Sequence, residues 1–140
     1  SDERTVQEIP AVVRRLRAGF DSGQTKPLSW RKTQLQRLVD MCIKHRDNIT
    51  SAINRDLKVL GPMANLMEVG STIQEARAAI ANLDSWAAPT KRDIPLIVRP
   101  AKGRMGTEPY GVALIIGPWN YPFRLLSFPV RPLSHYPLLL

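Results

Sequence analysis

Apolar residues recur every three or four positions through most of the first 88 residues. In the opening segment they share one face of a predicted helix that ends at Asp21-Ser22-Gly23; its apolar positions are Val6, Ile9, Val13, Leu16 and Phe20. A second helix follows, and a third begins near Asp47-Asn48; their inward positions are Leu35, Leu38, Val39 and Cys42, then Ile49, Ile53 and Leu57. After the break at Gly61-Pro62 a longer helix continues to Ala88-Pro89; its apolar positions are Leu66, Val69, Ile73, Ala76, Ile80 and Leu83. The pattern therefore predicts helices over residues 5–88.

The helical spacing of apolar residues ends at Pro89. Residues 92–108 carry Pro and Gly where a helix would fail, which favours extended structure. Residues 112–116 are all apolar and lie between Gly111 and Gly117, a run typical of a strand buried on both faces of an α/β sheet. Such a strand needs parallel neighbours, and no later β-α unit follows to supply them. We therefore expect an α/β fold in which N-terminal helices precede the first strands of a truncated sheet.

The net charge of +8, with a pI near 10.3, can indicate a nucleic-acid or anionic-membrane partner. The basic residues are spread along the chain, and the densest groups, Arg14-Arg15-Arg17 and Arg31-Lys32, fall within predicted amphipathic helices. Solvated helix faces explain this distribution, so we expect no nucleic-acid partner. A small basic helical binding module in residues 1–88, without enzymatic activity, remains the alternative, and tight, salt-dependent binding would favour it.

The chain has one cysteine, Cys42, which excludes an internal disulfide and a zinc cluster and suits a reducing compartment. It lies on the apolar face of a predicted helix, where a thiol is expected to be buried, protonated and inert. The first ten residues lack the apolar core of a secretory signal, and no window approaches eighteen apolar residues. We expect no metal site and an intracellular protein, cytoplasmic or membrane-associated, with no transmembrane segment in this chain.

The most informative stretch is residues 108–122, Glu-Pro-Tyr-Gly-Val-Ala-Leu-Ile-Ile-Gly-Pro-Trp-Asn-Tyr-Pro, in which a predicted strand runs directly into a turn. It resembles the strand and active-site turn of the aldehyde dehydrogenase superfamily, and its two ends are similar to the class-three, fatty-aldehyde-type branch. Upstream matches occur in the order of that branch; they are Val12-Val13-Arg14-Arg15 through Phe20, Ser22-Gly23-x-Thr25-Lys26-Pro27-Leu28, Arg31, Leu35, Ile53-x-x-Asp56-Leu57 and Trp86-Ala87.

The resemblance covers about residues 6–129 and implies the N-terminal part of an NAD(P)-binding, Rossmann-like domain over residues 1–129. Within it we expect the helices at 5–88, an extended segment of the oligomerisation type at 92–108, and the central strand and active-site turn at 110–122. The full-length parent is expected to be a homodimer.

The same resemblance implies oxidation of an aldehyde, including long-chain or otherwise apolar aldehydes, to a carboxylic acid. NAD or NADP accepts the hydride, and a cysteine thiolate forms a thiohemiacetal and then a thioester. Asn120 is implied to be catalytic and to offer its side-chain N–H to the developing oxyanion; losing one such donor typically costs on the order of a hundredfold to a thousandfold in rate. The implied cofactor-binding residues, on the nicotinamide-ribose side, are Ile116, Gly117, Pro118 and Trp119.

The residues alone leave alternatives open at this turn. Pro118 and Pro122 each fix their own φ and restrict the preceding residue, which would hold the segment rigid in either case. Asn120 could form an Asx-type turn, and Trp119 could anchor the turn by packing. No G-x-G-x-x-G motif is present, and the Lys-Pro-Ser-Glu segment with which the family reads its cofactor is absent, so the cofactor site is incomplete in this chain.

The other polar and aromatic residues considered are not expected to take part in catalysis. Glu68 and Glu75 share a helix face and are expected to be solvated rather than to act as a general base. His45 is expected to be a surface or capping group, and His135 lies in a Pro-rich segment without an adjacent nucleophile or metal partner. Trp30 and Trp86 are interpreted as helix-end packing residues.

The last residues depart from the family pattern. Pro129, Pro132 and Pro137 prevent a regular helix, since each interior proline costs about 3 kcal/mol, and residues 130–140 form a divergent Pro-rich tail. A frameshift, a retained intron or an alternative transcript would each produce such an ending. Because the sequence has neither the catalytic-loop cysteine nor the glutamate base of the family, we expect it to be inactive alone. The aldehyde, the choice between NAD and NADP, and membrane anchoring stay open.

Overall fold

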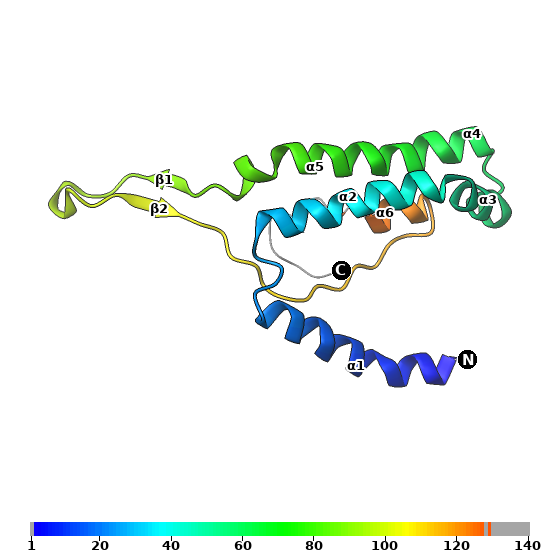
Figure 1. The fold of residues 1–140 in the computed structure, drawn as a ribbon, viewed down its shortest axis with the longest axis horizontal. Helices are drawn as coiled ribbons and strands as arrows, with labels where there is room; N and C mark the ends of the chain where they lie inside the picture. The colour runs from blue at the N-terminus through cyan, green and yellow to red at the C-terminus, as the bar shows by residue number, and fades with distance from the viewer. Residues whose placement is uncertain (1, 128, 130–140) are drawn as a thin grey trace.

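The computed structural model describes residues 2–127 and 129, and for residues 2–7 the backbone alone. Figure 1 shows a pair of long helices, a separate N-terminal helix and an extended two-stranded arm. In chain order the elements are α1 (Asp2–Asp21), α2 (Leu28–Lys44), α3 (Arg46–Leu57), α4 (Gly61–Ala64), the π-helical turn η1 (Asn65–Gly70), α5 (Ser71–Ala87), β1 (Thr90–Arg92), the 3₁₀ turn η2 (Leu96–Val98), β2 (Gly103–Met105) and α6 (Pro122–Ser127).

The core lies between α2 and α5, which run antiparallel and side by side (Figure 1). Its fully buried members include Val39 and Cys42 from α2, Val69 from η1, and Ala79 and Leu83 from α5. The apolar periodicity thus identified the packing faces of both helices correctly, because residues at i, i+3 and i+4 share one face. At the edge of this core, Lys32 Nζ lies 2.6 Å from Asp84 Oδ2 and joins the two helices near their solvent side.

The π-helical turn η1 shifts the apolar face of the helical segment that runs from α4 to α5. A π turn contains one residue more than an α turn, so the buried positions step back from Val69 to Ala64, five residues earlier. Leu66, which the periodicity places inside, is 67% exposed, whereas Glu68 is only 2% exposed. Both expectations, a buried Leu66 and a solvated Glu68, are therefore wrong, and the inserted residue is the reason.

Helix α1 forms over the predicted segment but lies apart from the α2–α5 pair (Figure 1). Its apolar face stays open to solvent along most of its described length: Ile9 is 53% and Val13 42% exposed. Near its end α1 meets the chain again at Gly111, where a Cβ would lie 3.3 Å from Arg17 Nη1 and 3.8 Å from Phe20 Cε1. Gly111 also has a φ of +116°, which favours glycine.

Strands β1 and β2 pair antiparallel, with Thr90 opposite Met105 and Arg92 opposite Gly103. They form the arm that projects away from the helices in Figure 1. Gly103 is required there, because a Cβ would lie 2.6 Å from the carbonyl oxygen of Arg92.

The expected central strand is not formed among the described residues. Residues 112–118 are extended but pair with no other strand, and Leu114 and Ile116 are each 84% exposed. A β-strand needs backbone hydrogen bonds to a neighbouring strand. The described strands β1 and β2 pair with each other and not with residues 112–118. The described part of the chain is therefore helix-rich, with a small two-stranded sheet, and the apolar run at 112–116 lacks the environment that its composition suits.

Candidate active site

The extended segment passes below α2 in Figure 1 and ends in a turn that leads into α6. Pro122 occupies the first position of α6, where its missing N–H costs no intrahelical hydrogen bond. The preceding residue, Tyr121, adopts a left-handed conformation with φ +55°, and its carbonyl accepts a hydrogen bond of 2.9 Å from the backbone N–H of Leu125. The turn at residues 118–121 is thus continuous with the first turn of α6.

Helix α6 is held against the core by one side chain and one carboxylate. Phe123 packs against the cluster formed by Val39, Cys42, Val69, Ile73 and Ala76. Glu68 Oε2 accepts hydrogen bonds from the backbone N–H groups of Phe123, at 2.9 Å, and Arg124, at 3.2 Å. These first-turn N–H groups lack acceptors within their own helix, and a carboxylate there is favoured by the helix dipole. The buried Glu68 therefore caps α6.

Asn120 lines a pocket of about 450 Å³ between this turn and the α3–η1 region. The pocket is lined by Leu57, Val59, Met63, Ala64, Met67, Glu68, Trp119, Asn120 and Tyr121. Its lining residues are mostly aliphatic and aromatic, and the polar ones are Asn120 and Glu68. Such a pocket suits a ligand that combines an apolar chain with one polar group.

The residues implied to bind the cofactor lie along the outside of the same segment. Ile116 and Trp119 are 84% and 68% exposed, and Pro118 is exposed as well. Gly117 is covered on one side, because a Cβ there would lie 2.8 Å from both Cγ and Cδ2 of Leu126. The structure thus brings Trp119 and Asn120 together at the pocket, whereas Ile116, Gly117 and Pro118 do not line it.

Cys42 is fully buried, as expected, and lies in the α2–α5 core rather than at the pocket. Burial raises the pKa of its thiol above the ordinary value, because desolvation penalises the thiolate. His45 is exposed at the junction of α2 and α3, and Glu75 is half-buried on α5. Trp30 and Trp86 lie half-buried near the first turn of α2 and the last turn of α5. His135 is outside the described residues.

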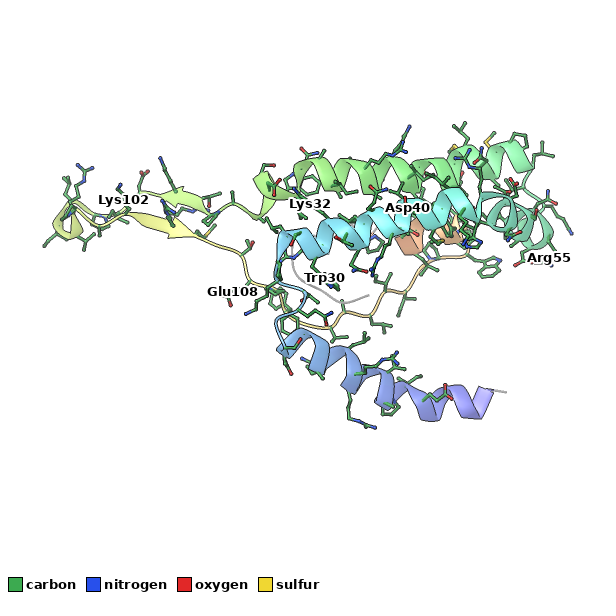
Figure 2. All side chains as sticks on the ribbon, viewed as in Figure 1. Trp30, Lys32, Asp40, Arg55, Lys102 and Glu108 are labelled. Atoms are coloured by element: carbon green, nitrogen blue, oxygen red, sulfur yellow. The ribbon has the colours of Figure 1, made fainter. Side chains whose placement is uncertain are left out.

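Figure 2 shows two of the basic side chains far apart in the molecule, Lys102 on the arm and Arg55 on α3. Among residues 2–127, no helix is long and apolar enough to cross a membrane, and no cluster of three or more His, Cys, Asp or Glu side chains could hold a metal ion.

Sequence reasoning missed Glu68, which lies at this pocket and binds α6. A signal was present in part: a helix that begins at Pro122 exposes N–H groups at Phe123 and Arg124, and these need an acceptor. Which residue supplies it could not be read from the sequence, because Glu68 and Phe123 are 55 positions apart.

The sequence model of the aldehyde dehydrogenase family matches residues 2–133. This chain belongs to the aldehyde dehydrogenase family. It is 37% identical, over 128 residues, to aldehyde dehydrogenase family 3 member F1 of Arabidopsis thaliana, covering 91% of this chain and 26% of that protein. It is 36% identical, over 129 residues, to the dimeric NADP-preferring aldehyde dehydrogenase of Canis lupus familiaris, covering 89% of this chain and 28% of that protein.

Among solved structures, the chain is similar to the substrate-bound state of Staphylococcus aureus AldH. The TM-score is 0.80 at 34% sequence identity, covering 85% of this chain and 26% of AldH. The chain thus spans about a quarter of the length of the relatives that it matches.

Proposed function

We propose that this chain is the N-terminal portion of an NAD(P)-dependent aldehyde dehydrogenase that oxidises aldehydes, including long-chain or otherwise apolar ones, to carboxylic acids. The observation that carries the proposal is the pocket of about 450 Å³ that Asn120 lines together with mostly apolar residues. Family membership makes the reaction class the natural one for this pocket.

Asn120 has the chemistry that the oxyanion role needs. When a nucleophile attacks an aldehyde carbon, negative charge develops on the oxygen, and a fixed N–H donor stabilises that charge more than it stabilises the substrate. A carboxamide donates without titrating, so its contribution does not depend on pH. The turn that carries Asn120 is anchored through α6, which limits the reorganisation needed when charge develops.

The apolar wall supports an apolar substrate chain. Leu57, Met63 and Met67 contribute flexible aliphatic side chains, and thioethers adapt to ligands of varied shape. An alkyl or polyene group in this part of the pocket would leave the aldehyde oxygen near Asn120. Burial of each methylene would contribute about 0.8 kcal/mol, which would favour longer aldehydes over shorter ones.

The cofactor fit is partial. Ile116 and Trp119 present exposed apolar surface beside Asn120, which suits one face of a flat nicotinamide ring, while Leu126 fills the other side of Gly117. We propose that residues 116–119 hold the nicotinamide-ribose edge, that other parts of the enzyme hold the remainder, and that the complete enzyme is a homodimer. Bound NAD or NADP would supply the hydride acceptor. The name of the Canis lupus familiaris relative gives an NADP preference for that protein, and the choice between NAD and NADP stays open for this chain.

The test uses a completed enzyme in which residues 2–127 of this chain precede the remaining C-terminal part of Staphylococcus aureus AldH. Asn120→Ala should lower kcat/KM by roughly a hundredfold or more, with modest effects on folding and cofactor affinity. Asn120→Asp should be slower still, because a carboxylate repels the developing negative charge. Asn82→Ala is the matched control, since the Asn82 amide donates to the carbonyl of Ala78 on the exposed side of α5.

Retention of near-normal turnover by both Asn120 variants, together with a loss of thermal stability, would contradict the catalytic assignment. Asn120 would then be a turn-forming residue, as its Asx character alone suggests.

A further inference from the structure

We infer that Glu68 is a positioning residue for Asn120: its buried carboxylate fixes the start of α6 and, through α6, the turn that carries the Asn120 amide. The inference deepens the proposed function and rests on the proposed role of Asn120. It concerns a side chain that the reaction scheme above does not use.

The contact geometry is specific. Glu68 is 2% exposed, and a single oxygen, Oε2, accepts both the Phe123 N–H at 2.9 Å and the Arg124 N–H at 3.2 Å. An unpaired carboxylate would be costly to bury, whereas two N–H donors at a helix start satisfy it. The carboxylate and α6 therefore hold each other in one arrangement.

The link from this contact to Asn120 is short. Only Tyr121 and Pro122 separate Asn120 from Phe123, and both have restricted backbones: Tyr121 is left-handed and Pro122 has a fixed φ. The Tyr121 carbonyl is also bound by the Leu125 N–H within α6. A displacement of the first turn of α6 would thus move Asn120, because the two intervening residues have little backbone freedom.

Glu68 also lines the same pocket as Asn120. The position results from η1, which turns Glu68 inward and Leu66 outward. Ser71 and Thr72, one turn later, donate their hydroxyls to the Glu68 carbonyl, so the backbone that carries the carboxylate is itself bound. The acceptor is therefore fixed before α6 docks onto it.

A purely structural role and a positioning role predict different kinetics. If Glu68 acts through Asn120, its loss must matter only while the Asn120 amide is present. If Glu68 only stabilises the fold, its loss must lower stability and must affect the rate equally with or without that amide. A double-mutant cycle separates the two, because coupling appears as non-additivity.

The experiment uses the completed enzyme with Glu68→Gln, Asn120→Ala and the double variant. Glu68→Gln keeps the shape of the side chain and removes its charge. We expect it to lower kcat/KM by roughly ten- to hundredfold, since an error of about 1 Å in a positioned group can cost about a hundredfold, while KM for NAD(P) stays unchanged. In the Asn120→Ala background the further loss should be less than about twofold. Asp84→Asn is the matched control, because that exposed carboxylate pairs with Lys32 away from α6.

Equal losses in both backgrounds, or no loss from Glu68→Gln, would overturn the inference while leaving Asn120 as the oxyanion donor. A normal rate in Asn120→Ala alone would instead remove the proposed function, and the inference with it. If Glu68→Gln did not fold, Glu68→Asp would replace it, since it keeps the charge but shortens the reach. Glu68→Asp should then slow the enzyme only when Asn120 is present, and a normal rate in that variant would equally overturn the inference.

Discussion

Addition of the C-terminal part of a relative, Staphylococcus aureus AldH, should convert this chain from an aggregation-prone polypeptide into a stable one. Large apolar side chains among the described residues lie open to solvent: Ile97 is 91% exposed, and Leu114 and Ile116 are each 84% exposed. Full burial of one such side chain stabilises a protein by about 1.5–3 kcal/mol, so covering these three would contribute roughly 5–9 kcal/mol. Exposed apolar surface of this kind is typical of a contact with another part of a protein.

The assay compares the isolated chain with the same chain mixed with the purified C-terminal part of Staphylococcus aureus AldH. Alone, the chain should bind a hydrophobic dye, sediment as a mixture of oligomers and melt without a sharp transition. With the C-terminal part present, dye binding should fall and a cooperative transition should appear. An isolated chain that is monomeric, binds no dye and melts sharply would refute the reasoning, because its exposed apolar surface would then be compatible with independent stability.

Gly117→Ala should destabilise the completed enzyme by about 1–3 kcal/mol in urea denaturation, because the added methyl group would lie 2.8 Å from the Leu126 side chain. Adding Leu126→Ala to that variant should restore most of the lost stability. Cys42 should resist alkylation until the chain unfolds. Burial raises the pKa of the Cys42 thiol above its value in the unfolded chain. The stability that the protonated thiol contributes should therefore be complete below the unfolded-state pKa of about 8.5 and should decline as pH rises through the folded-state pKa. Unfolding measurements on Cys42→Ala should lack this decline. The isolated chain should show no turnover with a medium-chain aldehyde and NAD⁺; NADH production abolished by Cys42→Ser would contradict the placement of Cys42 in the core.

The packing of α2 and α5 could be predicted from the sequence because it depends on local periodicity. Val39, Cys42, Ile73 and Leu83 lie on the expected faces, since a regular helix repeats its faces every 3.6 residues. Leu66 was placed wrongly because the π turn at η1 inserts one residue into that repeat, and no residue type signals such an insertion.

The strand expected at residues 112–116 shows a different limit. Its apolar composition specifies that both faces will be covered, but the covering elements are non-local, and the described residues do not contain them. Among the described residues the segment is therefore extended without a sheet, although its composition is typical of a strand covered on both faces. The same reasoning explains the exposed apolar face of α1 at Ile9 and Val13.

The two residues of the candidate site differ in how they can be found. The rigid turn around Asn120 could be predicted from a contiguous motif, because Pro118 and Pro122 restrict its backbone, whereas the catalytic role of Asn120 is implied by the family resemblance and stays a prediction. Glu68 becomes visible only when the unsatisfied N–H groups of α6 are followed to their acceptor in space. We infer that this carboxylate, by binding the start of α6, restrains the position of the nearby Asn120 amide. The partners of the Glu68 carboxylate are backbone N–H groups, so the interaction depends on where α6 begins rather than on which side chains α6 carries. Substitution of the Arg124 side chain should therefore be tolerated as long as the residue keeps its backbone N–H.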